Sequence, residues 1–140
     1  MSILAKWDAW SAEHPSSVID GLRIFLGLFI FYKGLFFMQN TAVLIEIIQP
    51  VDTAFSDFWM VHYVAMSHLA GGIFIALGLL TRLAVIIQIP ILLGAVIVNM
   101  MGANAIELTE SLVSFMLLLI FAFYGSGRFS ADHFFGIKAH

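Results

Sequence analysis

Polar side chains that could hydrogen-bond a ligand or exchange protons with it lie within otherwise apolar stretches of this 140-residue chain. They are Lys33, His68, Asn99, Glu107 and Glu110. An ammonium group and a carboxylate can neutralise each other, and an imidazole and an amide can both donate and accept hydrogen bonds. Together such groups could bind a small polar headgroup and exchange protons with it. That chemistry requires the chain to bring them together.

The elements that would position these residues are four long apolar stretches. They cover residues 18–38, 61–80, 83–101 and 106–124, and each is close to the ~20 residues needed to cross ~30 Å of hydrocarbon. Hydrophobic residues make up 61% of the chain and charged residues 11%, and the mean hydropathy is +1.01. A soluble domain is far less apolar. The sequence therefore predicts an all-α fold, a bundle of four transmembrane helices forming a single domain over residues 1–140.

Basic residues gather on one side of the predicted membrane. If the spans alternate in direction, five of the six Lys and Arg residues share a side, namely Lys6, Arg23, Arg82, Arg128 and Lys138. Basic short loops are retained in the cytoplasm, so we expect both termini to be cytoplasmic. Asp20 and Arg23 are three residues apart and can pair on one helical face. We interpret Asp20, Arg23, Arg82 and Arg128 as structural or topology-setting charges; Arg82 and Arg128 could reach lipid phosphates, and Arg82 could instead bridge helices.

Two regions outside the spans have amphipathic patterns. Residues 3–13 mix apolar and charged side chains and include Trp7 and Trp10, which suit the lipid headgroup zone. We expect an N-terminal interfacial helix there, with a disordered tail as the alternative. Between the first and second spans, residues 43–48 and 52–60 show similar patterns on either side of a proline. We expect two short amphipathic helices, which either cap the bundle or pack at its edge.

Small residues indicate where the spans approach one another closely. Gly71 and Gly72 lie on the second span, and Gly27 and Gly34 lie seven residues apart on the first. Glycine allows two helix backbones to come close together in a membrane. The second and third spans are separated by residues 81–82 alone, which predicts a tight antiparallel hairpin.

The polar residues fall at similar depths along the spans. Counting ~1.5 Å per residue from the basic side places Lys33 at about 22 Å and His68 at about 19 Å. The same count places Asn99 at about 24 Å and Glu110 at about 21 Å, with Glu107 one turn further out. Because these side chains lie at a similar depth, we expect them to line a polar pocket in the outer half of the bundle. Two alternatives remain open: a hydrogen-bonded clasp without a ligand, and extension of Lys33 and Glu107 toward the headgroups.

Several classes of site are excluded by what the sequence lacks. The chain has no cysteine, so it can form no disulfide, no Cys-x-x-Cys redox motif and no cysteine-ligated zinc or iron–sulfur site. His68 is the only histidine deep in a span, which argues against a haem held by two histidines. The sequence also lacks Gly-x-Ser-x-Gly and His-Glu-x-x-His motifs. We expect no metal site, no intrinsic cofactor and no nucleic-acid partner.

Two motifs carry a resemblance to a known family. Residues 71–84 read GGIFIALGLLTRLA, and residues 125–132 read GSGRFSAD. With Arg23 and the Lys33-Gly34 pair, they resemble the DoxX family of integral membrane proteins over about residues 18–132. The resemblance implies a four-span protein of the bacterial inner membrane. His68 stands where the family pattern places a glutamate three positions before the paired glycines, so the acidic role at that level could have passed to Glu110 or been lost.

The resemblance also implies a function. Members are linked to thiosulfate:quinone oxidoreduction and to thiol and oxidative-stress systems, so we expect a membrane subunit of a quinone-linked redox system. In that role Lys33, His68, Asn99, Glu107 and Glu110 would bind a quinone headgroup, and a partner would supply the metal or thiol centre. Whether this chain is itself part of a quinone-dependent oxidoreductase is left open. We expect it to form a homo-oligomer or to join a membrane complex.

A different class of function is the alternative. The chain could be a non-catalytic assembly or scaffold subunit, with a structural polar layer and outer amphipathic segments that dock a partner. A small-solute transporter is disfavoured because the chain has only four short spans and no inverted repeat.

Overall fold

The computed structural model describes residues 2–48, 57–102 and 104–137. Within these residues the chain contains helices and no strand. The helices are α1 (Ile3–Glu13), α2 (Ser17–Gln39), α3 (Thr41–Ile48), α4 (Asp57–Leu77), α5 (Thr81–Met101), α6 (Ala105–Tyr124) and α7 (Ala131–Phe134). Helices α2, α4, α5 and α6 are long and apolar enough to cross a membrane. The predicted all-α, four-span architecture is confirmed.

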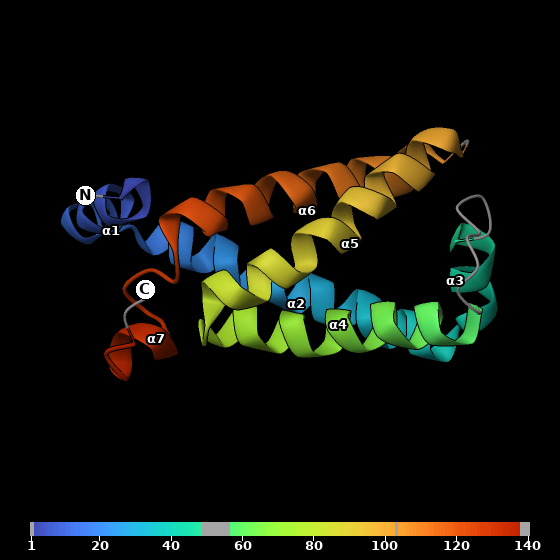
Figure 1. Ribbon diagram of the computed structural model, residues 1–140, viewed down its shortest axis with the longest axis horizontal. Coiled ribbons are helices and arrows are strands. Elements are labelled where there is room, and N and C mark those ends of the chain that lie inside the picture. Colours follow the sequence, from blue (N-terminus) through green and yellow to red (C-terminus); the bar gives the residue numbers. More distant parts are fainter. Residues whose placement is uncertain (1, 49–56, 103, 138–140) are drawn as a thin grey trace.

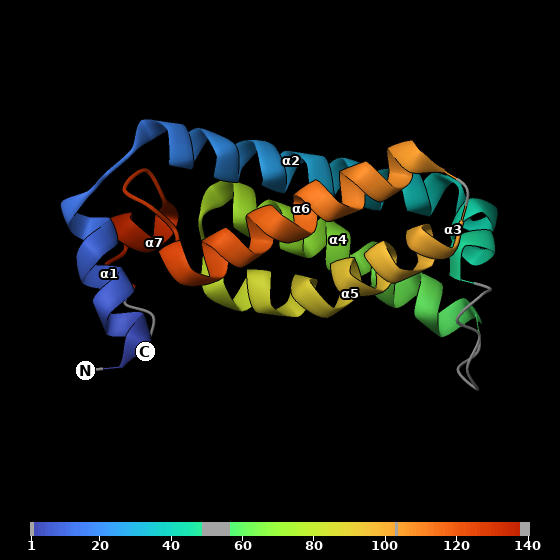
Figure 2. The same cartoon turned by 90° about the horizontal axis from the view of Figure 1, so that it is seen from above.

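The four long helices run along one axis, with α1 and α7 at one end of the bundle and α3 at the other (Figures 1 and 2). Helix α2 packs mainly on α4, and α5 packs mainly on α6, while contacts between α4 and α5 join the two pairs. The apolar core includes Leu26, Ile75, Val85, Leu118 and Phe121. These residues lie in the halves of their helices nearest α7, so the apolar core fills that half of the bundle.

Glycine brings α2 and α4 into close contact. A Cβ atom placed on Gly72 would lie 2.5 Å from the backbone nitrogen of Phe31 and 2.7 Å from the carbonyl oxygen of Gly27. Both neighbours are backbone atoms, so a side chain at Gly72 could be accommodated only if one helix moved away from the other. The prediction that glycines of the first and second spans allow close helix approach is confirmed.

We expect Gly72→Ala to lower the free energy of unfolding by about 1–3 kcal/mol, because overpacking forces the two backbones apart. The matched control is Gly21→Ala on α2, since a Cβ atom there would meet nothing within 4 Å. Alanine favours helix over glycine, so the control should be neutral or slightly stabilising. Thermal unfolding in detergent, followed by circular dichroism, measures both. Equal stability of the two variants would contradict close packing at Gly72.

The hairpin between α4 and α5 differs from the prediction. We expected residues 81–82 to form the connection, but both lie in the first turn of α5, and the connection is residues 78–80. Gly78 has a φ of +70°, and the Gly78 and Leu79 amides donate to the carbonyls of Ile75 and Phe74. This is a Schellman ending of α4, which requires the left-handed conformation that glycine adopts readily. Residues 79 and 80 are both leucine and continue the apolar stretch, so the sequence pattern did not indicate that the helix ends before them.

The C-terminal segment fixes the start of α5. The carboxylate of Asp132 accepts hydrogen bonds from the backbone amides of Leu80, at 2.7 Å, and Thr81, at 3.0 Å. The Asp132 amide in turn donates to the Gly78 carbonyl at 2.9 Å. A carboxylate at a helix N-terminus satisfies amides that have no partner within the helix. The acid of the 125–132 motif is therefore a cap for α5 supplied by a distant segment.

The predicted short helices are partly within the described residues. Helix α1 confirms the expected helix over residues 3–13; the rings of Trp7 and Phe123 lie 6.1 Å apart, and the Tyr124 hydroxyl donates to the His14 carbonyl at 3.2 Å. The interfacial position of α1 stays a prediction. Helix α3 confirms the first helix expected between spans 1 and 2. Most of the second, at 52–60, lies outside the described residues, and its last four residues belong to α4.

Candidate functional site

A cavity of about 390 Å³ lies between the α2/α4 pair and the α5/α6 pair, in the half of the bundle nearest α3. Most of its lining is apolar or aromatic, as with Phe29, Phe37 and Pro90. The residues with polar groups that line it are Lys33, Tyr63, His68, Asn99, Glu107, Glu110, Ser111 and Ser114. All five residues with candidate chemistry from the sequence thus face one cavity, which occupies the part of the bundle that the apolar core leaves unfilled.

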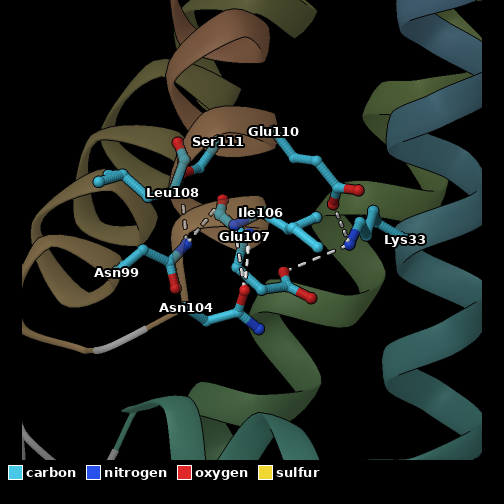
Figure 3. A network of polar contacts seen from close by, with 8 residues as sticks. All are labelled: Lys33, Asn99, Asn104, Ile106, Glu107, Leu108, Glu110 and Ser111. Carbon is cyan, nitrogen blue, oxygen red and sulfur yellow. Dashed lines mark hydrogen bonds and ion pairs between the residues drawn. The ribbon is translucent and has the colours of Figure 1, made fainter.

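Lys33 forms ion pairs across the cavity (Figure 3). Its Nζ lies 2.6 Å from Oε2 of Glu110 and 3.4 Å from Oε2 of Glu107. The Lys33 side chain is 19% exposed, and the two carboxylate side chains are 40% (Glu107) and 35% (Glu110) exposed. The carboxylates are three residues apart, so they share one face of α6. One ammonium from α2 is therefore shared by two carboxylates from α6.

Asn99 joins α5 to α6 beside this ion pair (Figure 3). Its Nδ2 donates to the backbone carbonyl of Glu107 and to Oγ of Ser111, at 3.2 Å each. The Ser111 hydroxyl donates to the Leu108 carbonyl at 3.0 Å. Asn104 caps the N-terminus of α6, and its Oδ1 accepts from the amide of Glu107 at 3.3 Å. These bonds fix the first turns of α6 and hence the position of both carboxylates.

His68 lines the same cavity but makes separate contacts. It is 5% exposed, and its Nδ1 lies 2.9 Å from the Val64 carbonyl oxygen on its own helix. Its ring packs edge-on against Phe37, with centroids 5.6 Å apart. Among the described residues, no hydrogen bond joins His68 to Lys33 or Glu110. A carbonyl oxygen can only accept, so Nδ1 carries the proton, and in the neutral ring Nε2 is an acceptor.

Reasoning from the sequence missed the serines of this site. Glu107, Glu110, Ser111 and Ser114 follow the spacing i, i+3, i+4 and i+7, which places them on one face of a helix. Serine is common in membrane helices, so its type alone gave no reason to select these two. Their spacing from the two glutamates was the signal that could have found them.

The charges at the opposite end of the bundle bind protein groups. Arg23 is 0% exposed; its Nη1 donates to the carbonyls of Ile75 and Ala76, at 2.7 Å each, and its Nη2 donates to the Phe129 carbonyl at 2.6 Å. Asp20 lies 4.0 Å from Arg23. Arg23 thus ties the end of α4 to the C-terminal segment.

Arg82 and Arg128, from the same set of basic residues, have different surroundings. Arg82 donates to the Phe123 carbonyl at 3.1 Å and pairs with Asp8, so it bridges α5, α6 and α1. Arg128 is exposed. Lys138 lies outside the described residues.

Comparison with known proteins identified one family. The family model described as DoxX matches residues 18–101, more than half of the chain. The match includes Lys33, His68 and Asn99, whereas Glu107, Glu110 and the 125–132 motif lie beyond it. No curated protein and no solved structure matched the chain.

Proposed function

The chain belongs to the DoxX family and is a multi-pass membrane protein, and from this premise we propose that it binds a quinone-type headgroup in the cavity between its helix pairs. In this proposal it is the membrane subunit of a quinone-linked redox system, of the sulfur-compound or the thiol and oxidative-stress type. It resides in the bacterial inner membrane with both termini in the cytoplasm. Because the chain has no cysteine, a partner protein supplies the thiol or metal centre.

The observation that carries the proposal is a cluster of ionisable groups in the wall of an otherwise apolar cavity. Ligand pockets commonly have volumes of roughly 300–1,000 Å³ and a few polar groups that orient the ligand. A cavity of about 390 Å³ lies within this range. Intramembrane charges are costly, and in most membrane proteins they mark functional sites. A quinone has the matching chemistry, since its ring carries two polar oxygens and its tail is apolar.

The residues that line the cavity have different roles under this proposal. Lys33 supplies positive charge beside the headgroup, and Glu107 and Glu110 accept or return protons. Asn99 acts through Glu107 and Ser111, because its amide donates to those residues. The apolar walls, including Phe29 and Phe37, exclude water and hold the ring and the start of the tail.

The proposal is tested by a substitution that fills the cavity and leaves its polar side chains unchanged. Gly94 lines the cavity, and a Cβ atom there would meet nothing within 4 Å. We expect Gly94→Phe to occupy the ligand's space and to weaken quinone binding at least about tenfold, a loss of ~1.4 kcal/mol. Isothermal titration calorimetry with a short-chain quinone in detergent measures the affinity. The matched control, Gly21→Phe, makes the same change at another open helical glycine. Undiminished binding by Gly94→Phe would refute ligand binding in the cavity.

One observation favours a second candidate, the scaffold subunit. Helices α2 and α6 make few contacts with each other, and the ion pairs from Lys33 to Glu107 and Glu110 join these two helices. In that case these charged side chains hold the bundle together and bind no ligand. Organic extraction of purified protein separates the candidates: bound quinone supports the redox subunit, and a stable co-purifying protein without quinone supports the scaffold.

A further inference from the structure

The polar groups of the cavity that remain available to a ligand are mostly acceptors. Glu107 and Glu110 together present four carboxylate oxygens, and both carboxylates pair with the one ammonium of Lys33. Lys33 has three N–H groups, and contacts to two carboxylates leave it one at most. The two glutamates and this lysine carry a combined charge of −1 when ionised. Electrostatics here therefore favour a donor or a positive charge over another acceptor.

The amide and one hydroxyl among the neutral donors around the cavity are already engaged by the protein. Both N–H groups of the Asn99 amide are used, on the Glu107 carbonyl and on Ser111 Oγ. The Ser111 hydroxyl proton is used on the Leu108 carbonyl. What these groups leave free is Oδ1 of Asn99, which has no hydrogen bond within the described residues. The hydroxyls of Ser114 and Tyr63 can each donate or accept, so they favour neither kind of ligand.

His68 also presents a hydrogen-bond acceptor to the cavity. Its Nδ1 proton is directed to the Val64 carbonyl, which leaves Nε2 of the neutral ring with a lone pair. No described residue donates to Nε2. His68 is nearly fully buried and lines the cavity from α4, while the carboxylates line it from α6. A ligand between these helices would therefore meet acceptors on two of its sides.

We infer that the cavity prefers a headgroup that donates hydrogen bonds to one that only accepts them. The inference rests on the proposed function, and for a quinone-type ligand it means that the hydroquinone form binds more tightly than the quinone form. The two hydroxyls of a hydroquinone can donate to a carboxylate of α6 and to His68. The carbonyls of a quinone would place acceptors against acceptors, and such groups lose their hydration without gaining partners.

Three ligands of the same ring and chain length test this inference on the wild-type protein. They are a short-chain quinone, its hydroquinone, and the dimethyl ether of that hydroquinone, which has lost both donors. Isothermal titration calorimetry in detergent under argon should give the hydroquinone an affinity about tenfold or more above the other two, as expected for a hydrogen bond to a charged group. A quinone that binds as tightly as the hydroquinone would overturn the inference but support the proposed function. If none of the three binds, the proposed function fails as well.

Two variants test whether the preference for hydroquinone over quinone arises from the carboxylates of the cavity. Glu110→Gln replaces a carboxylate oxygen by an amide nitrogen that donates, so the preference for hydroquinone should fall to a fewfold difference or less. The matched control is Glu46→Gln, because Glu46 is exposed on α3 and does not line the cavity. The control should keep the full preference. An unchanged preference in Glu110→Gln would overturn the role given to this carboxylate.

Discussion

Replacing Arg23 by alanine should lower the free energy of unfolding by about 3–5 kcal/mol, the cost commonly found when one partner of a buried charge network is removed. The fully buried guanidinium group donates to the carbonyls of Ile75, Ala76 and Phe129. Without it, the carbonyls of Ala76 and Phe129 lose their side-chain donor, the Ile75 carbonyl keeps only the Gly78 amide, and the Asp20 carboxylate keeps only the Phe129 amide. Each such group costs about 1–3 kcal/mol when left unpaired. We expect the C-terminal segment to detach from α4 in this variant.

The control for Arg23 is the exposed Arg128 in the same part of the bundle. Arg128→Ala should change stability by no more than about 0.5 kcal/mol, as is usual for a surface substitution. Unfolding of both variants in detergent, followed by circular dichroism against added SDS, gives the comparison. If the two arginines proved equally dispensable, the buried role of Arg23 would be contradicted.

Replacing Lys33 by methionine should also be costly, by about 2 kcal/mol, because two carboxylates on one face of α6 then lie in the membrane without a cation. The single ammonium lies within 2.6 Å of Glu110 and 3.4 Å of Glu107. Part of the cost is offset because both carboxylates are partly exposed. Lys6→Met, at an exposed lysine of α1, is the matched control and should be close to neutral.

The source of the Lys33 effect is tested by removing the carboxylate charges as well. Adding Glu107→Gln and Glu110→Gln to Lys33→Met should restore most of the lost stability, since no unpaired charge remains. The same unfolding experiment measures the triple variant. Additive losses instead of recovery would mean that the three side chains do not interact.

Much of the fold could be predicted because the bilayer imposes simple requirements on sequence. A span needs about 20 apolar residues, and those stretches are visible directly. The same requirement made Lys33, Asn99 and Glu110 conspicuous, because a polar residue in such a stretch needs a partner or a function. Residue counting then placed these side chains at one depth, and the structure places them around one cavity.

The remaining features depend on contacts between distant residues. The carbonyl groups that bind Arg23 belong to Ile75, Ala76 and Phe129, and every residue has such a group, so sequence could not select them. The orientation of His68 depends on a bond to its own helix at Val64, which fixes Nδ1 as the donor. The size of the cavity depends on how the helix pairs separate, which no single residue specifies.

The most direct test of the central claim, that a headgroup binds among Lys33, Glu110 and His68, is an experimental structure in lipid nanodiscs with a short-chain hydroquinone. We predict density for its ring in the cavity between α2 and α6, with an oxygen about 3 Å from the Glu110 carboxylate. Density on the lipid-facing surface alone, or a cavity closed by side chains with no room for a ring, would contradict the account.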